Sequence, residues 1–125
     1  MELLLDTHIL YWTLYERTKQ PALATKLILE ADAVYVSASS FWEIAIKVRI
    51  GKLKADLDEI VASIEPAGFH ELPITSRHAA QVAHLPLHHG DPFDRMLVAQ
   101  AISEQLHLIT TDSRLPQYGD LVIRV

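Results

Sequence analysis

The chain has 125 residues, half of them hydrophobic, and contains no cysteine. This length suits a single domain over 1–125 with a substantial core, and the lack of cysteine excludes disulfides and thiolate zinc sites. The net charge of −5 argues against broad electrostatic capture of nucleic acid. Because no apolar run reaches the length of a membrane span and the N-terminus lacks a basic leader, we expect a cytoplasmic protein with no membrane partner.

Short apolar segments alternate with helical patterns along the whole chain. The predicted elements, in chain order, are a strand at 3–5, helices at 7–15 and 21–30, a strand at 34–36, helices at 39–50 and 57–64, a strand at 69–72, helices at 75–83 and 93–105, and strands at 106–109 and 121–125. Ser39 and Ser40 are expected to cap the third helix, and Gly51 to end it. The alternation favours an α/β fold with a mainly parallel sheet covered on both faces.

Four carboxylates stand where a predicted strand hands over to a helix, or in a helix's first turn. They are Asp6, Glu43, Asp94 and Asp112. Open α/β sheets bind ligands at the carboxyl edge of their strands, where these residues are expected to meet. Converging carboxylates repel one another unless a cation lies between them, and Mg²⁺ or Mn²⁺ suits oxygen ligands. The pattern predicts one or two metal ions and hydrolysis of phosphodiester bonds by metal-activated water.

Each acid also has a local structural explanation. Asp6 is suited to cap the helix that begins at residue 7, and Glu43 completes a capping-box pattern with Ser40. Asp112 is suited to cap the turn at 113–115. Asp91 is an additional acid, which we favour as a helix cap over a water-mediated metal ligand. The metal-site hypothesis therefore rests on the four acids taken together.

Residues beside the acids are candidates for supporting the site or holding substrate. They are Thr7, Thr111, Asp91, Arg95, Arg114 and Lys47. The threonines would hydrogen-bond the adjacent acids or simply shape turns. The arginines would hold substrate phosphates, although surface arginine is the commoner meaning. For the lysine, an ion pair with Glu43 one helical turn earlier is favoured over a catalytic role.

Three other groups of residues admit two interpretations each. The basic stretch Lys47–Lys54 is a phosphate-binding patch or, as we favour, a solvated helix end. His84, His88 and His89 are favoured as solvated loop residues over a zinc site or a contact with RNA or a partner. A further group is aromatic, and core packing is favoured for it over a groove or self-association face. Its members are Tyr11, Trp12, Tyr15, Phe41 and Trp42.

The acids and their flanking residues, in the segments 4–8, 39–44, 91–101 and 110–112, resemble those of a PIN domain. More narrowly, the chain is similar to the VapC-type ribonuclease toxins of bacterial toxin–antitoxin pairs. This resemblance covers nearly the whole chain. It implies a three-layer α/β/α sandwich with four or five strands and an endoribonuclease that depends on Mg²⁺ or Mn²⁺. It also implies a homodimer and a cognate antitoxin whose C-terminal segment blocks the acidic site.

Carried over residue by residue, the resemblance implies that all four acids occupy the family's acidic positions. Asp6 and Asp94 are then the best candidates for direct metal ligands. Glu43 would orient or deprotonate the attacking water, directly or through a second metal. Asp112 is the least certain, because the family tolerates variation there.

Two other classes of protein compete with the nuclease. A two-component receiver domain is disfavoured because Asp6 stands alone after its strand and no lysine follows Lys54. A catalytically silent PIN-like module that binds a partner is the remaining alternative, and the presence of all four acids argues against it. The sequence contains no motif that selects one RNA, and the chemistry is also compatible with DNA cleavage.

Overall fold

The computed structural model describes residues 1–125. Its strands are β1 (Glu2–Leu5), β2 (Ala33–Ser37), β3 (His70–Leu72), β4 (His107–Thr110) and β5 (Val122–Arg124). Its α-helices are α1 (Thr7–Tyr15), α2 (Ala22–Glu30), α3 (Ala38–Arg49), α4 (Leu57–Ile64), α5 (Ser76–Val82) and α6 (Pro92–Glu104). Two short 3-10 helices, η1 (Arg17–Lys19) and η2 (Leu115–Tyr118), complete the chain. Every predicted strand and helix is present.

The five strands form one parallel sheet in the order β3-β2-β1-β4-β5. The chain first builds outward from β1 through β2 to β3, and then returns to place β4 on the other side of β1. This reversal makes a topological switch point between β1 and β4, where open α/β sheets have their ligand crevice. The register pairs Leu5 with Ile109, so the residues that follow these two strands also lie side by side.

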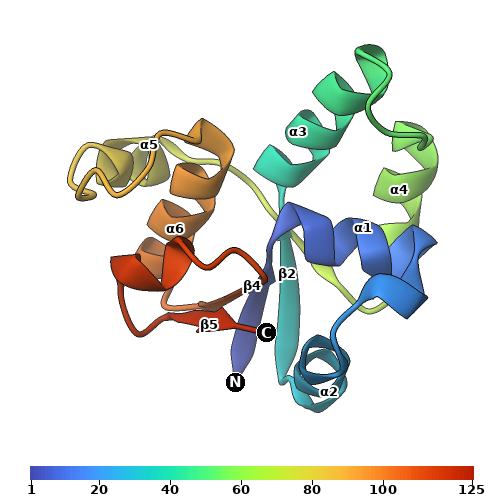
Figure 1. Cartoon of the computed structure of the whole chain (residues 1–125), viewed down its shortest axis with the longest axis horizontal. Helices are drawn as coiled ribbons and strands as arrows, with labels where there is room; N and C mark the ends of the chain where they lie inside the picture. The colour runs from blue at the N-terminus through green and yellow to red at the C-terminus, as the bar shows by residue number, and fades with distance from the viewer.

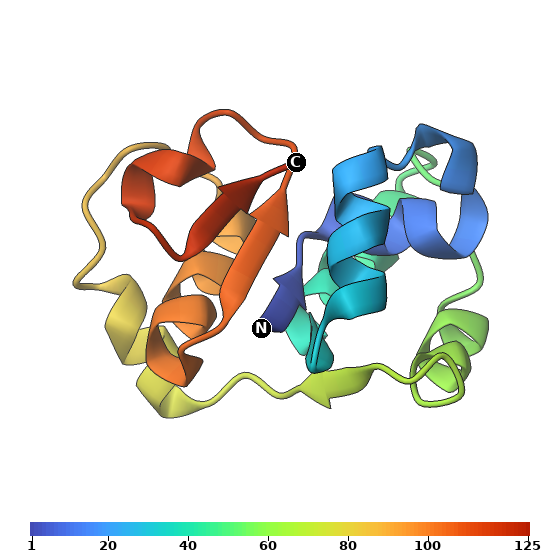
Figure 2. The ribbon, with the colours of Figure 1, turned by 90° about the horizontal axis from the view of Figure 1, so that it is seen from below.

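Helices cover both faces of the sheet, which confirms the predicted three-layer α/β/α sandwich. Figure 1 shows α5 and α6 on one side of the central strands and α1 to α4 on the other. In Figure 2 the chain passes from one side to the other through β3. The fully buried residues of β1 divide between the two layers, because Leu3 and Leu5 pack with the first four helices and Leu4 packs with α6. No helix is both long and apolar enough to cross a membrane.

The cap of α3 lies two to three residues earlier than predicted. Ser37, the last residue of β2, caps the helix by accepting a hydrogen bond from the Ser39 amide at 3.0 Å. Ser39 and Ser40 are therefore inside the helix, and the predicted capping box between Ser40 and Glu43 is wrong. Because the strand already supplies the cap, the Glu43 side chain is available to the edge of the sheet.

Candidate active site at the carboxyl edge of the sheet

Three helices begin at the carboxyl edge of the sheet. α1 and α3 follow directly on β1 and β2, and α6 begins there because it precedes β4 and runs back along the sheet (Figure 1). Each directs the positive end of its dipole toward this edge, which favours negative charge there. The four predicted acids are carried by these helices and by the segment after β4.

Asp6 is the most enclosed of the acids, with 4% of its surface exposed. Its carboxylate accepts a hydrogen bond from the Thr110 hydroxyl, which lies beside it in the register of β1 and β4. Burial raises the pKa of Asp6, and the nearby Glu43 carboxylate raises it further. Asp6 occupies the N-cap position of α1, but its carboxylate is held chiefly by the Thr110 hydroxyl and only weakly by the first turn of the helix.

Glu43 is a buried carboxylate with one oxygen satisfied and one left over. Its Oε2 atom lies 2.8 Å from the Lys47 ammonium one helical turn later, which is the predicted ion pair. Its Oε1 atom is buried and has no hydrogen-bond partner. A buried acceptor without a partner is unfavourable, so this oxygen is suited to receive a cation or a water proton.

Asp94 stands in the first turn of α6, where Asp91 caps the helix by accepting from the amides of Phe93 and Asp94 at 2.9 and 3.0 Å. Burial is the largest influence on Asp94 and raises its pKa to about 7. The neighbouring carboxylates that raise it further belong to Asp6, Asp91, Glu43 and Asp112. The four predicted acids are therefore close enough to repel one another.

A buried histidine supports Asp94. The His89 Nε2 atom lies 3.3 Å from the Asp94 carboxylate, and its Nδ1 atom lies 2.7 Å from the Tyr118 hydroxyl. Burial lowers the pKa of His89, and the charge of Arg114 lowers it further. The interpretation of His89 as a solvated loop residue is therefore wrong, whereas His84 and His88 are exposed.

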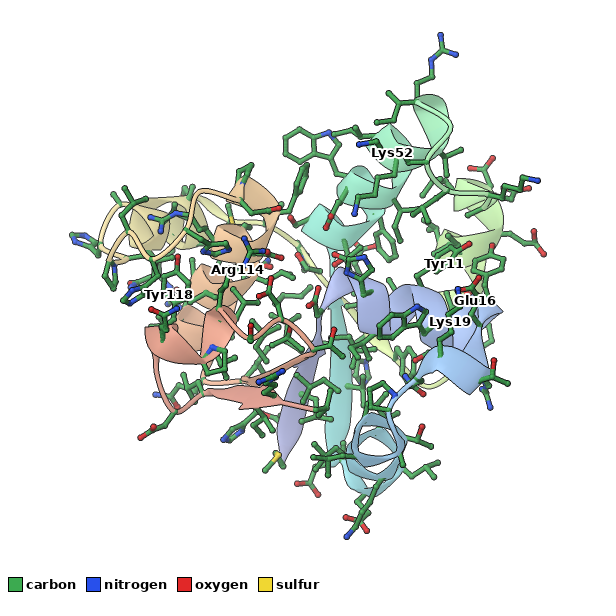
Figure 3. All side chains as sticks on the ribbon, viewed as in Figure 1. Tyr11, Glu16, Lys19, Lys52, Arg114 and Tyr118 are labelled. Atoms are coloured by element: carbon green, nitrogen blue, oxygen red, sulfur yellow. The ribbon has the colours of Figure 1, made fainter.

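Asp112 differs from the other three acids because an arginine already neutralises it. The Arg114 side chain donates to both carboxylate oxygens, with its closest contact at 2.6 Å. These bonds lower the pKa of Asp112 to about 2. The carboxylate also accepts from the Arg114 amide at 2.9 Å, which is the predicted turn cap. Asp112 is thus half of an ion pair with Arg114, the residue labelled in Figure 3.

The other predicted supporting residues have different partners from those expected. Thr7 donates to the Ser40 hydroxyl at 2.9 Å rather than to an acid. Thr111 makes no side-chain hydrogen bond. The neighbouring Thr110 instead makes the hydrogen bond to an acid that was expected of Thr111. Arg95 donates to the Pro86 carbonyl and the Tyr118 hydroxyl at 2.9 and 3.0 Å, so it fastens the loop before α6.

Three supporting residues were missed by sequence reasoning, namely Thr110, His89 and Tyr118. One signal was available for Thr110. Successive side chains of a strand point to opposite faces of the sheet, so only every second residue at the end of β4 can share a face with the residue paired to it in β1. Nothing in the sequence connects His89 with Tyr118, since their contact depends on how two separate loops pack.

The acidic site fits a hard divalent cation by its chemistry. Asp6 is buried and Asp94 half-buried, both carboxyl groups have raised pKa values, and Glu43 adds an oxygen with no partner. Oxygen donors of this kind, with excess negative charge, are what Mg²⁺ and Mn²⁺ require. As the side chains lie, no three acids or histidines are grouped closely enough to enclose an ion. The carboxylates would have to draw together around one.

Comparison with known proteins agrees with this architecture. The sequence matches the PIN domain family over residues 3–121. It is 31% identical over 115 residues to Ribonuclease VapC22 of Mycobacterium tuberculosis, covering 90% of this chain and 88% of that protein.

Two solved structures have the same fold at lower sequence identity. VapBC2 from Rickettsia felis, bound to a DNA fragment from its promoter, superposes with a TM-score of 0.72 at 15% identity, covering 100% of this chain and 98% of that one. A toxin–antitoxin complex from Klebsiella pneumoniae gives 0.66 at 18% identity, with 97% and 95% covered. The family match and the VapC relative together show that the chain belongs to the PIN-domain family and is of the VapC type.

Proposed function

We propose that this chain is a metal-dependent endoribonuclease, the toxin of a toxin–antitoxin pair. The observation that carries the proposal is the convergence of Asp6, Glu43 and Asp94 at the switch point of the sheet, with two raised pKa values and one unpartnered oxygen. The VapC relative, named as a ribonuclease, supports RNA as the substrate.

Asp6 and Asp94 would hold one or two Mg²⁺ or Mn²⁺ ions, with Glu43 and Asp112 as further candidate ligands. A bound ion of this kind lowers the pKa of water and polarises a phosphoryl oxygen. The free Oε1 atom of Glu43 would accept the proton of the attacking water as the phosphodiester bond is hydrolysed. Lys47 would keep the other Glu43 oxygen in place, and Thr110 would do the same for Asp6.

Cleavage of a mixed cellular RNA pool tests this proposal directly. Purified protein is incubated with Mg²⁺ or Mn²⁺, or with EDTA, beside Asp6→Asn, Asp94→Asn and Asp120→Asn. Asp120 is an exposed acid before β5, at the opposite edge of the sheet, and serves as the matched control. We expect metal-dependent cuts that both site variants lose by at least a hundredfold and that the control retains.

Two outcomes contradict this expectation. Equal cutting by wild type and site variants would place the activity elsewhere or in a contaminant. No cutting by folded protein free of antitoxin would favour the catalytically silent partner-binding module.

The proposal includes two protein partners. The structural neighbours described as VapBC and toxin–antitoxin complexes support an antitoxin. The homodimer is supported by an apolar face on α3 and its C-cap residue, which we define as Trp42, Ile46 and Ile50, exposed to 61, 39 and 59%. Beside it lies a pocket of about 400 Å³ that Trp42 lines together with Phe93 and Met96. Exposed apolar surface of this kind marks an association site.

A further inference from the structure

Each of the four acids has a side chain of this protein as its partner. The pairs are Asp6 with Thr110, Glu43 with Lys47, Asp94 with His89, and Asp112 with Arg114. His89 is the one side chain that hydrogen-bonds the Asp94 carboxylate, at 3.3 Å from its Oδ2 atom, and the His89 side chain is only 5% exposed. His89 is therefore placed to decide how the Asp94 carboxylate is oriented.

Both ring nitrogens of His89 have partners, which fixes the ring. Its Nε2 atom faces the Asp94 carboxylate, and its Nδ1 atom lies 2.7 Å from the Tyr118 hydroxyl. Turning the ring over would bring carbon atoms to both positions and lose both hydrogen bonds. The ring thus has one orientation in which each of its nitrogens is satisfied.

Arg95 determines the direction of these hydrogen bonds. A guanidinium group can only donate, and Arg95 donates to the Tyr118 hydroxyl oxygen at 3.0 Å. The proton of that hydroxyl is then available to the Nδ1 atom of His89, and a ring nitrogen that accepts a hydrogen bond carries no proton. The one proton of the ring lies on Nε2, where it is donated to the Asp94 carboxylate.

The fold holds this chain of hydrogen bonds at the start of α6. Arg95 follows Asp94 in the helix and also donates to the Pro86 carbonyl at 2.9 Å, in the loop that carries His89. Tyr118 belongs to η2, which lies against α6 (Figure 3). The chain runs from Arg95 through Tyr118 and His89 to Asp94, so it joins the helix, the loop and η2.

The partner of Asp94 differs in charge from that of Asp112. Arg114 brings a full positive charge within 2.6 Å of Asp112, which offsets the negative charge that would attract a metal ion. An imidazole with one proton is neutral, so its hydrogen bond orients a carboxylate without cancelling the charge. Asp94 can therefore be held in place and keep the charge that a divalent cation requires.

We propose that His89 is a positioning residue that holds the Asp94 carboxylate ready for the metal ion, and that Tyr118 acts through His89 by fixing its orientation and tautomer. The inference rests on the proposed function, because it takes Asp94 as a metal ligand. Neither His89 nor Tyr118 would itself bind the ion. Their effect is on how strongly the site holds it.

Isothermal titration with Mn²⁺ measures this effect without RNA. His89→Leu removes the donor, His89→Gln keeps an N–H group in the place of Nε2, and Tyr118→Phe removes only the hydroxyl. His88→Leu is the matched control. The His88 ring also lies against Tyr118, with ring centroids 4.8 Å apart, but His88 is exposed and its side chain forms no hydrogen bond or ion pair.

We expect His89→Leu to weaken Mn²⁺ binding about 10- to 100-fold, as loss of a partner of a metal ligand does. Tyr118→Phe should weaken it severalfold, and His88→Leu should leave it unchanged. His89→Gln should recover most of the affinity, because the amide restores the hydrogen bond although not the ring. Equal losses in His89→Leu and His89→Gln would overturn the inference. Thermal melts establish that each variant is folded.

Nuclear magnetic resonance tests the tautomer without metal or substrate. Long-range proton–nitrogen correlation spectra show which ring nitrogen of a histidine carries the proton, and the signals of His89 are those missing from His89→Gln. At mildly alkaline pH we expect the proton on Nε2 in the wild type and a mixture of both tautomers in Tyr118→Phe. A proton on Nδ1 in the wild type, alone or together with one on Nε2, would overturn the inference.

Cleavage assays separate this inference from the proposed function. His89→Leu should need about tenfold more Mn²⁺ than wild type for half-maximal RNA cleavage and should approach the wild-type rate at saturating Mn²⁺, because the lost bond weakens metal binding. Metal-dependent cleavage with equal Mn²⁺ affinity in wild type, His89→Leu and Tyr118→Phe would overturn the inference and leave the nuclease standing. Weaker Mn²⁺ binding in His89→Leu, restored by His89→Gln, in a protein that cuts no RNA would overturn the nuclease and leave the positioning histidine.

Discussion

Asp94 and Asp112 are the same chemical group in opposite surroundings, although both lie at one edge of the sheet. Asp94 is enclosed among other carboxylates, so its pKa rises to about 7. Asp112 is held by Arg114, so its pKa falls to about 2. The first group depends on a cation that the chain itself does not supply, whereas the second already has one. This difference makes Asp94 the stronger candidate for a direct metal ligand.

The raised pKa of Asp94 predicts a pH-dependent stability change in metal-free protein. Between an unfolded value near 3.8 and a folded value of about 7, the folded carboxyl binds more protons than the unfolded one, so stability falls as pH rises through this window. Relative to wild type in EDTA, Asp94→Asn should therefore gain roughly 2 kcal/mol in free energy of unfolding between pH 4 and pH 8. This is about half the full electrostatic value because some solvent reaches the carboxyl.

Urea unfolding at four pH values measures this difference. Asp120→Asn is the control and should show a constant offset from wild type. A difference between Asp94→Asn and wild type that stays the same from pH 4 to pH 8 would contradict the pKa assignment.

The pair Thr110 and Thr111 allows a matched test of support for Asp6. Thr110 donates to the Asp6 carboxylate and also accepts from the Asp112 amide at 3.0 Å, so it joins two of the acids. Thr110→Val should weaken Mn²⁺ binding 10- to 100-fold, as loss of a supporting hydrogen bond does at metal sites. Thr111→Val should leave it unchanged. Isothermal titration with Mn²⁺ measures both, and equal effects would argue against the register-based assignment.

At the scale of the elements, helix starts decide which acids are available for chemistry. The cap of α3 is Ser37, which leaves Glu43 free, and the cap of α6 is Asp91, which places Asp94 in the first turn. In each helix the cap residue accepts from a backbone amide of the first turn, so a different side chain, Glu43 or Asp94, is available to face the site. Asp6, at the start of α1, is held chiefly by the neighbouring strand, through the Thr110 hydroxyl.

Asp91 can be tested as a cap rather than a metal ligand. Asp91→Ala should lower the free energy of unfolding by about 1 kcal/mol, because two amides of α6 lose their acceptor. Asp91→Ser should keep the free energy of unfolding within about 0.5 kcal/mol of the wild-type value, since serine also caps well. Both variants should keep RNA cleavage within a few fold of wild type. A loss by Asp91→Ser as large as that of Asp6→Asn would identify Asp91 as a ligand.

At the scale of the whole molecule, the order of the strands builds the site. β1 lies between β2 and β4, so acids from distant parts of the chain meet where the direction of winding reverses. The same arrangement leaves α3 with two different surroundings. Its beginning presents Glu43 to the site, and its exposed side carries the apolar face.

The apolar face predicts the oligomeric state. Trp42→Glu should shift the protein from dimer to monomer at micromolar concentration, because a charge would be buried in the interface. Leu29→Glu is the matched control, since Leu29 is 79% exposed on α2, far from this face in the sequence. Light scattering after gel filtration measures both masses. A dimer that survives Trp42→Glu and dissociates with Leu29→Glu would move the interface to α2.

The sequence by itself determined the elements, the fold class and the positions of the acids along the chain. Strands such as Leu3–Leu5 and the caps before helices are specified by patterns within about ten residues, and such patterns can be read locally. The family resemblance added the order of the acids and the expected chemistry.

Only the tertiary structure decided how the acids are held. The hydrogen bond between Thr110 and Asp6 joins residues 104 positions apart, and the contact of His89 with Tyr118 joins two loops. The raised pKa of Asp94 likewise arises from burial and from carboxylates on other segments. These features depend on strand register, loop packing and solvent exclusion, which are properties of the assembled fold and leave no local pattern in the sequence.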